Sequence, residues 1–365
     1  MTTITESVRV LVVEDSRVDS ELICRMLRTS PEVKVAATTG TGRDAVSLVA
    51  KLEPDVVVLD LQLPDMGGLD VIEELMAYRP LPILVLSAIG GDKGVALEAL
   101  ARGAVEVMEK PELSTKELFD HHSSVLTQTV RIVSRARVIT HPRRRLSQKG
   151  PRSLAALSGR EIVLRPEPAA SAGGPRVAVI GVAASTGGPQ ALQSVLSDLP
   201  VSLPVPVLVV QHIARGFTQG LVDWLGNTVS LPVQIAHDGA LAAPGHVYVA
   251  AEGLHLELRH RRLVLRAGEP VGSHMPSADV LLSSMASDLR ERALAVVLTG
   301  MGRDGARGAR AVHDAGGKVI AQDESTSVVY GMPKAAAELG AVDEVLPIGE
   351  IASAIIRRVQ AGRAA

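Results

Sequence analysis

The chain of 365 residues is long enough for two or three domains. Its composition, 46% hydrophobic and 21% charged, is that of a globular protein, and no apolar run in it reaches the length of a membrane span. The first residues lack the pattern of a secretory signal, and the single cysteine, Cys24, excludes an internal disulfide. We therefore expect a cytoplasmic protein without membrane insertion.

The charges divide the chain into three parts. Residues 1–130 carry 12 Lys and Arg against 21 Asp and Glu, residues 131–165 carry 10 against 1, and the rest is nearly neutral. An acidic block, a basic stretch and a neutral block are typical of a domain, a linker and a second domain. We place the boundaries at 1–137, 138–174 and 175–365, because the middle part is rich in Arg, Pro, Ser and Gly and has no sustained periodicity.

The first block alternates apolar runs with stretches of helical periodicity, which predicts parallel βαβ units. The predicted strands are followed by Glu14, Asp15, Asp60, Ser87 and Lys110. Because the carboxyl ends of parallel strands lie at one edge of a sheet, these side chains should lie together. The three carboxylates suit Mg²⁺, and the serine and lysine could hold a phosphoryl group beside it.

The motifs VLVVEDS, VVVLDLQLPDMGGLD, ILVLSA and EKP make this block resemble the receiver domains of bacterial response regulators. The resemblance implies a flavodoxin-like fold with a five-stranded parallel sheet. It implies that Asp60 accepts a phosphoryl group from a histidine kinase, and that Glu14 or Asp15, Asp60 and the Gln62 carbonyl bind Mg²⁺. The serine and lysine of the cluster would sense the phosphorylated state. Receivers usually have Tyr or Phe where this chain has Val107, so we do not expect an aromatic switch.

The basic run HPRRRLSQKGPRS allows two interpretations, a nucleic-acid contact or a solvated linker. No helix-turn-helix or other binding fold follows it, and aromatic residues, which form stacking surfaces for bases, make up 2% of the chain. We favour the linker and expect no nucleic-acid partner.

The second block alternates in the same way, except that residues 232–266 contain short strands joined by turns. This predicts an α/β three-layer domain with a mostly parallel sheet and an antiparallel edge. Residues 232–266 contain four histidines whose spacing does not match that of metal ligands: His237, His246, His255 and His260. We interpret them as surface residues. A zinc hydrolase is not expected.

Three predicted strands of this block end near Ser185, His212 and Asp304. A serine nucleophile needs a base, and the base needs an orienting carboxylate. The small residues around Ser185 permit a sharp strand-to-helix turn that exposes its hydroxyl, and the start of the following helix offers N–H groups to an oxyanion. Taken singly, Ser185 and Asp304 could equally be helix caps and His212 a packed residue. Their coincidence favours a catalytic triad.

The motifs GVAASTGGPQAL, VVQHIARGFT, SHMPSAD and VVLTGMGRDGARG resemble the catalytic domain of the chemotaxis protein-glutamate methylesterases, which follows a receiver in that family. The resemblance implies that Ser185 is the nucleophile, His212 the general base and acid, and Asp304 the orienting carboxylate. It also implies that the N–H of Met301 stabilises the oxyanion and that Thr186 lines the pocket. No cofactor is expected for the ester chemistry.

The function implied is hydrolysis of γ-glutamyl methyl esters on the cytoplasmic helices of chemoreceptors, with deamidation of receptor glutamines as a related activity. The phosphoryl donor would be a chemosensory histidine kinase, and the receiver would restrain access to the catalytic cleft. Arg215 and His274 could reshape the surface that meets the substrate. We expect a monomer. The alternative is a response regulator whose output is binding without catalysis.

Overall fold

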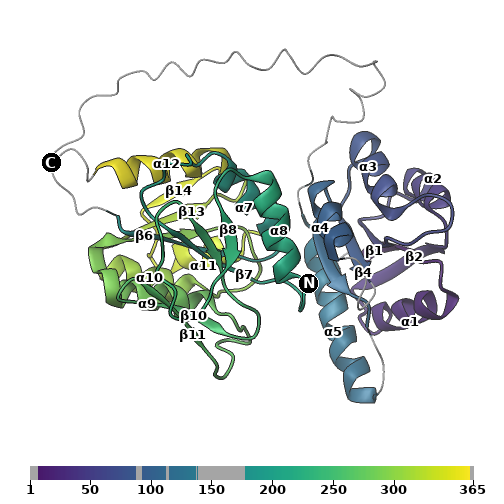
Figure 1. Cartoon of the computed structure of the whole chain (residues 1–365). Helices are drawn as coiled ribbons and strands as arrows, with labels where there is room; N and C mark the ends of the chain where they lie inside the picture. Colours follow the sequence, from purple (N-terminus) through teal and green to yellow (C-terminus); the bar gives the residue numbers. More distant parts are fainter. Residues whose placement is uncertain (1–6, 88–92, 112–114, 137, 139–176, 362–365) are drawn as a thin grey trace, which may run out of the picture.

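The computed structural model describes residues 7–87, 93–111, 115–136, 138 and 177–361. Two α/β units, each built on its own parallel sheet, account for these residues (Figure 1). The expected linker lies almost wholly outside them, so the three domain boundaries stay predictions. Within the described part of the chain, no helix has the length and apolar character that a membrane crossing requires.

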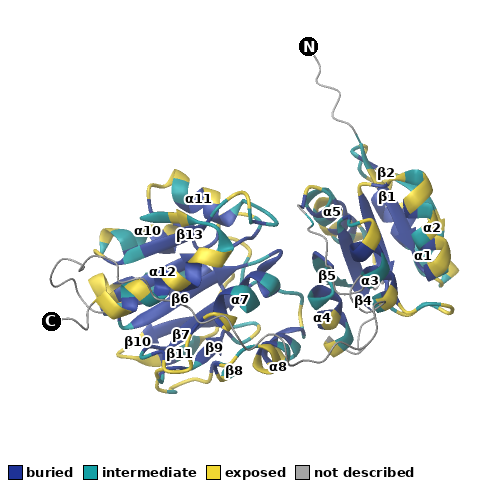
Figure 2. Cartoon of the chain, turned by 90° about the horizontal axis from the view of Figure 1, so that it is seen from above, coloured by how far each residue is buried: buried dark blue, intermediate teal, exposed yellow. Residues whose placement is uncertain are grey.

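The N-terminal unit confirms the predicted five-stranded parallel sheet, in the order β2-β1-β3-β4-β5. Its strands alternate with helices that cover both faces (Figure 2). The elements are β1 (Val8–Val13), α1 (Arg17–Leu27), β2 (Val33–Thr39), α2 (Gly42–Leu52), β3 (Val56–Asp60), α3 (Gly68–Tyr78), β4 (Ile83–Ser87), α4 (Lys93–Ala101), β5 (Glu106–Glu109) and α5 (Lys116–Val133).

The C-terminal unit has a seven-stranded sheet in the order β14-β13-β12-β6-β7-β9-β8, in which every pair of neighbours is parallel. Its first half comprises β6 (Val179–Ala184), α7 (Gly188–Ser197), β7 (Val207–Gln211), α8 (Thr218–Thr228), β8 (Val233–Ile235), β9 (Val247–Val249), β10 (His255–Arg259) and β11 (Arg262–Arg266). Its second half comprises α9 (Ala278–Leu289), η2 (Arg290–Arg292), β12 (Ala293–Val297), α10 (Ala306–Asp314), β13 (Lys318–Gln322), α11 (Met332–Glu338), β14 (Glu344–Leu346) and α12 (Ile348–Gln360).

The antiparallel element of this unit is present but smaller than expected. Only β10 and β11 pair in antiparallel fashion among the described strands, and they form a separate two-stranded sheet. The strands β8 and β9, which the sequence also suggested were part of it, join the edge of the main sheet in parallel. They are three residues long, too short to show the continuous apolar run that marks a buried parallel strand.

The central strands β6, β7 and β12 are buried along their whole length, because helices cover both faces of the sheet (Figure 2). Their residues are almost all Val, Ile, Leu, Ala and Gly, the pattern expected for parallel strands without a solvent face. These three strands are neighbours, in the order β12-β6-β7. The residues that come after them in the chain therefore meet at one edge of the sheet.

The two units touch along α4 of the first and α7 and α8 of the second (Figure 1). The Gln190 side chain on α7 donates hydrogen bonds to the backbone carbonyls of Leu100, at 3.1 Å, and Ala104, at 2.8 Å. The first of these carbonyls lies in the last turn of α4, and the second lies in the loop before β5. The contact thus brings β5 close to the turn that joins β6 to α7.

Gly181, in β6, provides a test of how tightly α9 packs on the sheet. A Cβ at this position would lie 2.5 Å from Met285 Sδ and 2.7 Å from Leu282 Cδ2. We expect Gly181→Ala to lower the free energy of unfolding by about 1–3 kcal/mol. Gly226→Ala in α8, where nothing lies within 4 Å of the added Cβ, should instead raise it by up to about 1 kcal/mol. Calorimetry measures the free energy of unfolding of both variants. Equal values for Gly181→Ala and Gly226→Ala would contradict the close packing of α9 on β6.

Candidate active site

A tight turn between β6 and α7 carries Ser185. Gly187 adopts a φ of 73°, and a Cβ there would lie 2.5 Å from Val328 Cβ. A Cβ at Gly188 would lie 2.0 Å from Gln211 Oε1. Gly187 needs a positive φ, and both glycines lie too close to neighbouring side chains for a Cβ. The turn therefore requires glycine at these two positions. Ser185 itself stays partly exposed at the tip.

Hydrogen bonds from the neighbouring strands hold this turn in place. Gln211, at the end of β7, donates to the carbonyl oxygens of Ser185, at 2.8 Å, and His212, at 2.7 Å. Thr299, just after β12, accepts from the Ser185 N–H at 3.1 Å, and its hydroxyl donates to the Thr186 carbonyl at 3.0 Å. The ends of three adjacent strands are thereby linked around Ser185.

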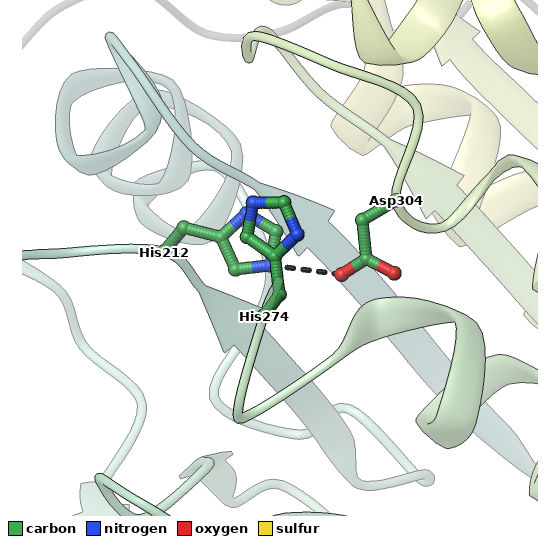
Figure 3. Close-up of side chains that lie close together, drawn as sticks. All are labelled: His212, His274 and Asp304. Carbon is green, nitrogen blue, oxygen red and sulfur yellow. Dashed lines mark hydrogen bonds and ion pairs between the residues drawn. The ribbon is translucent and has the colours of Figure 1, made fainter. Parts of the chain in front are cut away.

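His212 follows β7 directly and pairs with Asp304, which lies in the loop between β12 and α10 (Figure 3). The distance from His212 Nε2 to Asp304 Oδ2 is 2.9 Å. Because a carboxylate only accepts, Nε2 carries the ring proton and Nδ1 presents a lone pair. Nδ1 is buried, and no group in the described part of the chain bonds to it. The pair therefore leaves one basic nitrogen available, on the side of the ring away from Asp304.

Asp304 is 6% exposed and is surrounded by hydrogen-bond donors. The Ser277 hydroxyl donates to it at 2.7 Å, and the backbone N–H groups of Ala278 and Asp279 donate at 2.7 and 3.0 Å. Burial alone would raise the pKa of this carboxyl, but the bonds from His212, Ser277 and the two amides outweigh it and hold the pKa well below its usual range. Asp304 is therefore a carboxylate at neutral pH.

His274 stacks on His212, with ring centroids 4.1 Å apart and an angle of 18° between the planes (Figure 3). Burial and the neighbouring His212 lower the pKa of His274, which favours the neutral form of its ring. Lone pairs of two stacked rings run in parallel planes and do not converge on one ion, although the two histidines and Asp304 lie close together. The sequence suggested His274 at the substrate surface, and its contact with His212 could not be deduced from spacing.

The interpretation of His255 as a surface residue is wrong. His255 is 1% exposed, whereas His237 and His260 are exposed as expected and His246 is half-buried. The error arose because the first four residues of β10 are all buried, so the alternation of polar and apolar residues along this strand does not mark a solvent-exposed face.

The two remaining predicted residues of this site lie beside Ser185. Gly300 approaches so closely that a Cβ there would lie 2.7 Å from Ser185 Cβ, and Met301 is the next residue along the chain. Thr186 is 8% exposed, and its side chain forms a hydrogen bond with Glu106, in β5 of the N-terminal unit. The five predicted residues of the second block thus gather at one edge of the sheet.

The predicted cluster of the first block also assembles. The carboxylates of Glu14, Asp15 and Asp60 bring oxygen atoms within 4.8 Å of one another. Lys110 Nζ lies 2.9 Å from Asp60 and 2.8 Å from Glu14. Burial and the nearby Asp60 raise the pKa of Glu14, against the lowering effect of Lys110. Ser87 is buried at the end of β4.

This cluster fits a hard divalent cation, because three carboxylates share one small region and a single ammonium, that of Lys110, bonds to two of them. Glu14, Asp15 and Asp60 would hold Mg²⁺. Gln62, whose carbonyl was also expected to bind, donates its N–H to Asp60 Oδ1 at 3.3 Å, which keeps that peptide beside the cluster.

Two family models match the chain: the response regulator receiver domain over residues 10–122 and the CheB methylesterase over residues 180–355. A protein-glutamate methylesterase/protein-glutamine glutaminase of Myxococcus xanthus is 40% identical over 96% of this chain and 93% of its own length. The one from Salmonella typhi is 35% identical over 98% of each chain. The solved catalytic domain of Thermotoga maritima CheB methylesterase is 38% identical and covers 50% of this chain and 99% of its own, with a TM-score of 0.49.

The fold and the matches define a receiver domain joined to a methylesterase domain. The chain belongs to the family of protein-glutamate methylesterases/protein-glutamine glutaminases. The resemblance seen in the motifs is confirmed.

The cluster around Asp60 can be tested by its response to Mg²⁺. At about 100 times the dissociation constant, bound Mg²⁺ should stabilise the protein by about 2.7 kcal/mol. Asp15→Asn should weaken this effect, because it removes one ligand without disturbing a buried group. Asp44→Asn makes the same charge change at an exposed residue outside the cluster and should leave the effect intact. Thermal melting with and without Mg²⁺ measures both, and equal responses would contradict the assignment.

Proposed function

We propose that this enzyme hydrolyses glutamate methyl esters on chemoreceptors by means of Ser185, His212 and Asp304, under the control of phosphorylation at Asp60. The observation that carries the proposal is the His212–Asp304 pair, which leaves Nδ1 buried and without a described hydrogen-bond partner. The backbone N–H of His212 donates to the Ala184 carbonyl at 2.9 Å, next to the turn that carries Ser185. Membership of the family supports the choice of substrate.

In the first half-reaction, Ser185 Oγ attacks the ester carbonyl while His212 Nδ1 takes its proton. The resulting imidazolium is stabilised by Asp304, to which Nε2 stays hydrogen-bonded. The tetrahedral intermediate then expels methanol, which leaves with the proton from Nδ1. The product is a glutamyl ester of Ser185. The N–H of Met301 and the start of α7 would stabilise the negative charge on the carbonyl oxygen.

In the second half-reaction, His212 Nδ1 takes a proton from water, and the hydroxide attacks the same carbonyl. The bond to Ser185 Oγ breaks, Oγ recovers the proton, and a free glutamate side chain is released. A receptor glutamine would follow the same course with ammonia as the first leaving group, which accounts for deamidation by the same residues.

The triad is tested by methanol release from methylated receptor. Ser185→Ala should lower kcat by about 10⁴-fold or more, because it removes the nucleophile from a partly exposed loop without leaving a cavity. Ser197→Ala, at the exposed end of the same helix, should leave kcat unchanged. Near-normal methanol release by the Ser185→Ala protein would end the triad hypothesis.

The receiver is proposed to restrain the esterase in its resting state. It contacts α7 and α8 through α4, and its β5 reaches Thr186, the residue next to the nucleophile. Phosphorylation of Asp60 by a chemosensory kinase in the cytoplasm would add negative charge beside Lys110 and draw that lysine and Ser87 toward the phosphoryl group. Lys110 directly follows β5, so the contact with Thr186 would be altered.

Glu106 makes this contact sensitive to pH. Glu106 as a whole is partly exposed, but its carboxyl group is buried, and it is hydrogen-bonded to the Thr186 side chain and the Val107 N–H. Burial raises the pKa of this carboxyl from 4.5 to about 7, against smaller effects of the hydrogen bonds from Thr186 and the Val107 N–H. The restrained state, in which Glu106 contacts Thr186, therefore binds the proton of this carboxyl more tightly than a state in which the contact is broken. Its stability is greatest below pH 4.5, falls as pH rises, and levels off above about 7.

We therefore predict that restraint weakens as pH rises. The ratio of unphosphorylated to phosphorylated activity should increase between pH 5 and about 7, and Glu106→Gln, which stays neutral, should remove this increase. At pH 8 the unphosphorylated Glu106→Gln protein should be several-fold slower than the unchanged enzyme. Glu109→Gln, on the same strand, is the matched control. A ratio that does not vary with pH would contradict the proposed contact.

A further inference from the structure

His255 lies outside the residues proposed to react, yet it is 1% exposed and bonded on both sides of its ring. Its Nε2 lies 3.0 Å from the Glu269 carbonyl oxygen, and its Nδ1 lies 3.2 Å from the Ser277 backbone nitrogen. A carbonyl only accepts and an amide N–H only donates, so Nε2 carries the proton and Nδ1 accepts. The ring is held in one tautomer at the start of α9.

Ser277 is fully buried and immediately precedes α9. Its hydroxyl does not cap its own helix but donates to Asp304 Oδ1 at 2.7 Å. The first two N–H groups of α9, from Ala278 and Asp279, donate to the same carboxylate. Asp304 thus takes the place of the N-cap side chain of α9, and its position is tied to the first turn of that helix.

A second hydrogen bond joins β10 to α9 further along the helix. The Leu258 N–H donates to Ser284 Oγ at 2.9 Å. Ser284 lies two turns beyond Ser277, and it makes no described hydrogen bond to Asp304 or His212. The strand therefore holds the helix at two points, of which only the bond to His255 lies at the catalytic end.

We propose that His255 is a positioning residue for the esterase reaction. By holding the Ser277 backbone, it fixes the first turn of α9 and, through that turn, the carboxylate that orients His212. The inference rests on the proposed function. Because the described hydrogen bonds of His255 reach Glu269 and Ser277 and not Ser185 or His212, its loss should act on kcat through the geometry of Asp304 and leave KM largely unchanged.

Two conservative variants separate positioning from mere packing. His255→Asn places Oδ1 close to the position of Nδ1, so it can still accept from Ser277. His255→Gln can still donate to the Glu269 carbonyl, but it places no acceptor where Nδ1 accepts from the Ser277 N–H. We expect the Gln variant of the full-length, phosphorylated enzyme to lose on the order of 10- to 100-fold in kcat. Its acid limb in a plot of kcat against pH should move to lower pH, because the imidazolium loses a well-placed carboxylate. The Asn variant should stay within a few-fold of the unchanged enzyme.

Ser284→Ala is the matched control. It removes the other bond between β10 and α9, so it should lower the melting temperature but leave kcat and the pH profile unchanged. Equal activities of the Asn and Gln variants, or an equal shift of the profile in Ser284→Ala, would overturn the proposal. If the unchanged enzyme releases no methanol, the proposed function fails instead.

A measurement on the unchanged protein covers the case in which the His255 variants do not fold. Nitrogen-15 spectra of the histidine rings should show that His255 carries its proton on Nε2 and none on Nδ1 over the pH range of activity. A proton on Nδ1 would prevent acceptance from Ser277 and would overturn the proposal without any substitution.

Discussion

The hydrogen bond between His212 Nε2 and Asp304 is the interaction on which the rest of the site depends. It fixes the imidazole tautomer, and it requires a carboxylate that is charged although it is 6% exposed. A buried charge is costly unless its oxygens are hydrogen-bonded. Three further donors, all from the first residues of α9 and the serine before it, meet that requirement. The helix is therefore as much a part of the catalytic apparatus as the strands.

The parallel sheet explains why three residues distant in the sequence meet. The strands β12, β6 and β7 are neighbours, so the residues just beyond their carboxyl ends gather at one edge. The turn at Ser185 adds a second constraint, close approach of backbone, which Gly187, Gly188 and Gly300 satisfy. The same edge faces the receiver, whose β5 touches Thr186. Chemistry and control thus share one short turn.

The sequence was sufficient to predict the residues that end strands. Ser185 and His212, like Asp60 and Lys110, lie at or just beyond the ends of apolar runs, and parallel topology brings them to one edge of each sheet. Asp304 lies further along, in the loop between β12 and α10, and hydrogen bonds from the start of α9 fix its position. The sequence was not sufficient to predict side-chain contacts between different helices, strands and loops. The stacking of His274 on His212 and the burial of His255 depend on how a loop and a hairpin pack against α9, which leaves no periodic signal. The direction of the short strands β8 and β9 was missed because three residues are too few to show the continuous apolar run of a buried parallel strand.

The proton distribution on the His212 ring can be measured directly in the resting enzyme. Nitrogen-15 spectra of the full-length protein, assigned by comparison with a His212→Gln variant, report which nitrogen carries the proton. We predict that Nε2 is protonated and bonded to Asp304, and that Nδ1 is unprotonated and can accept the proton of Ser185. A resting enzyme with the proton on Nδ1 would have no base at the serine, and this result would contradict the proposed triad.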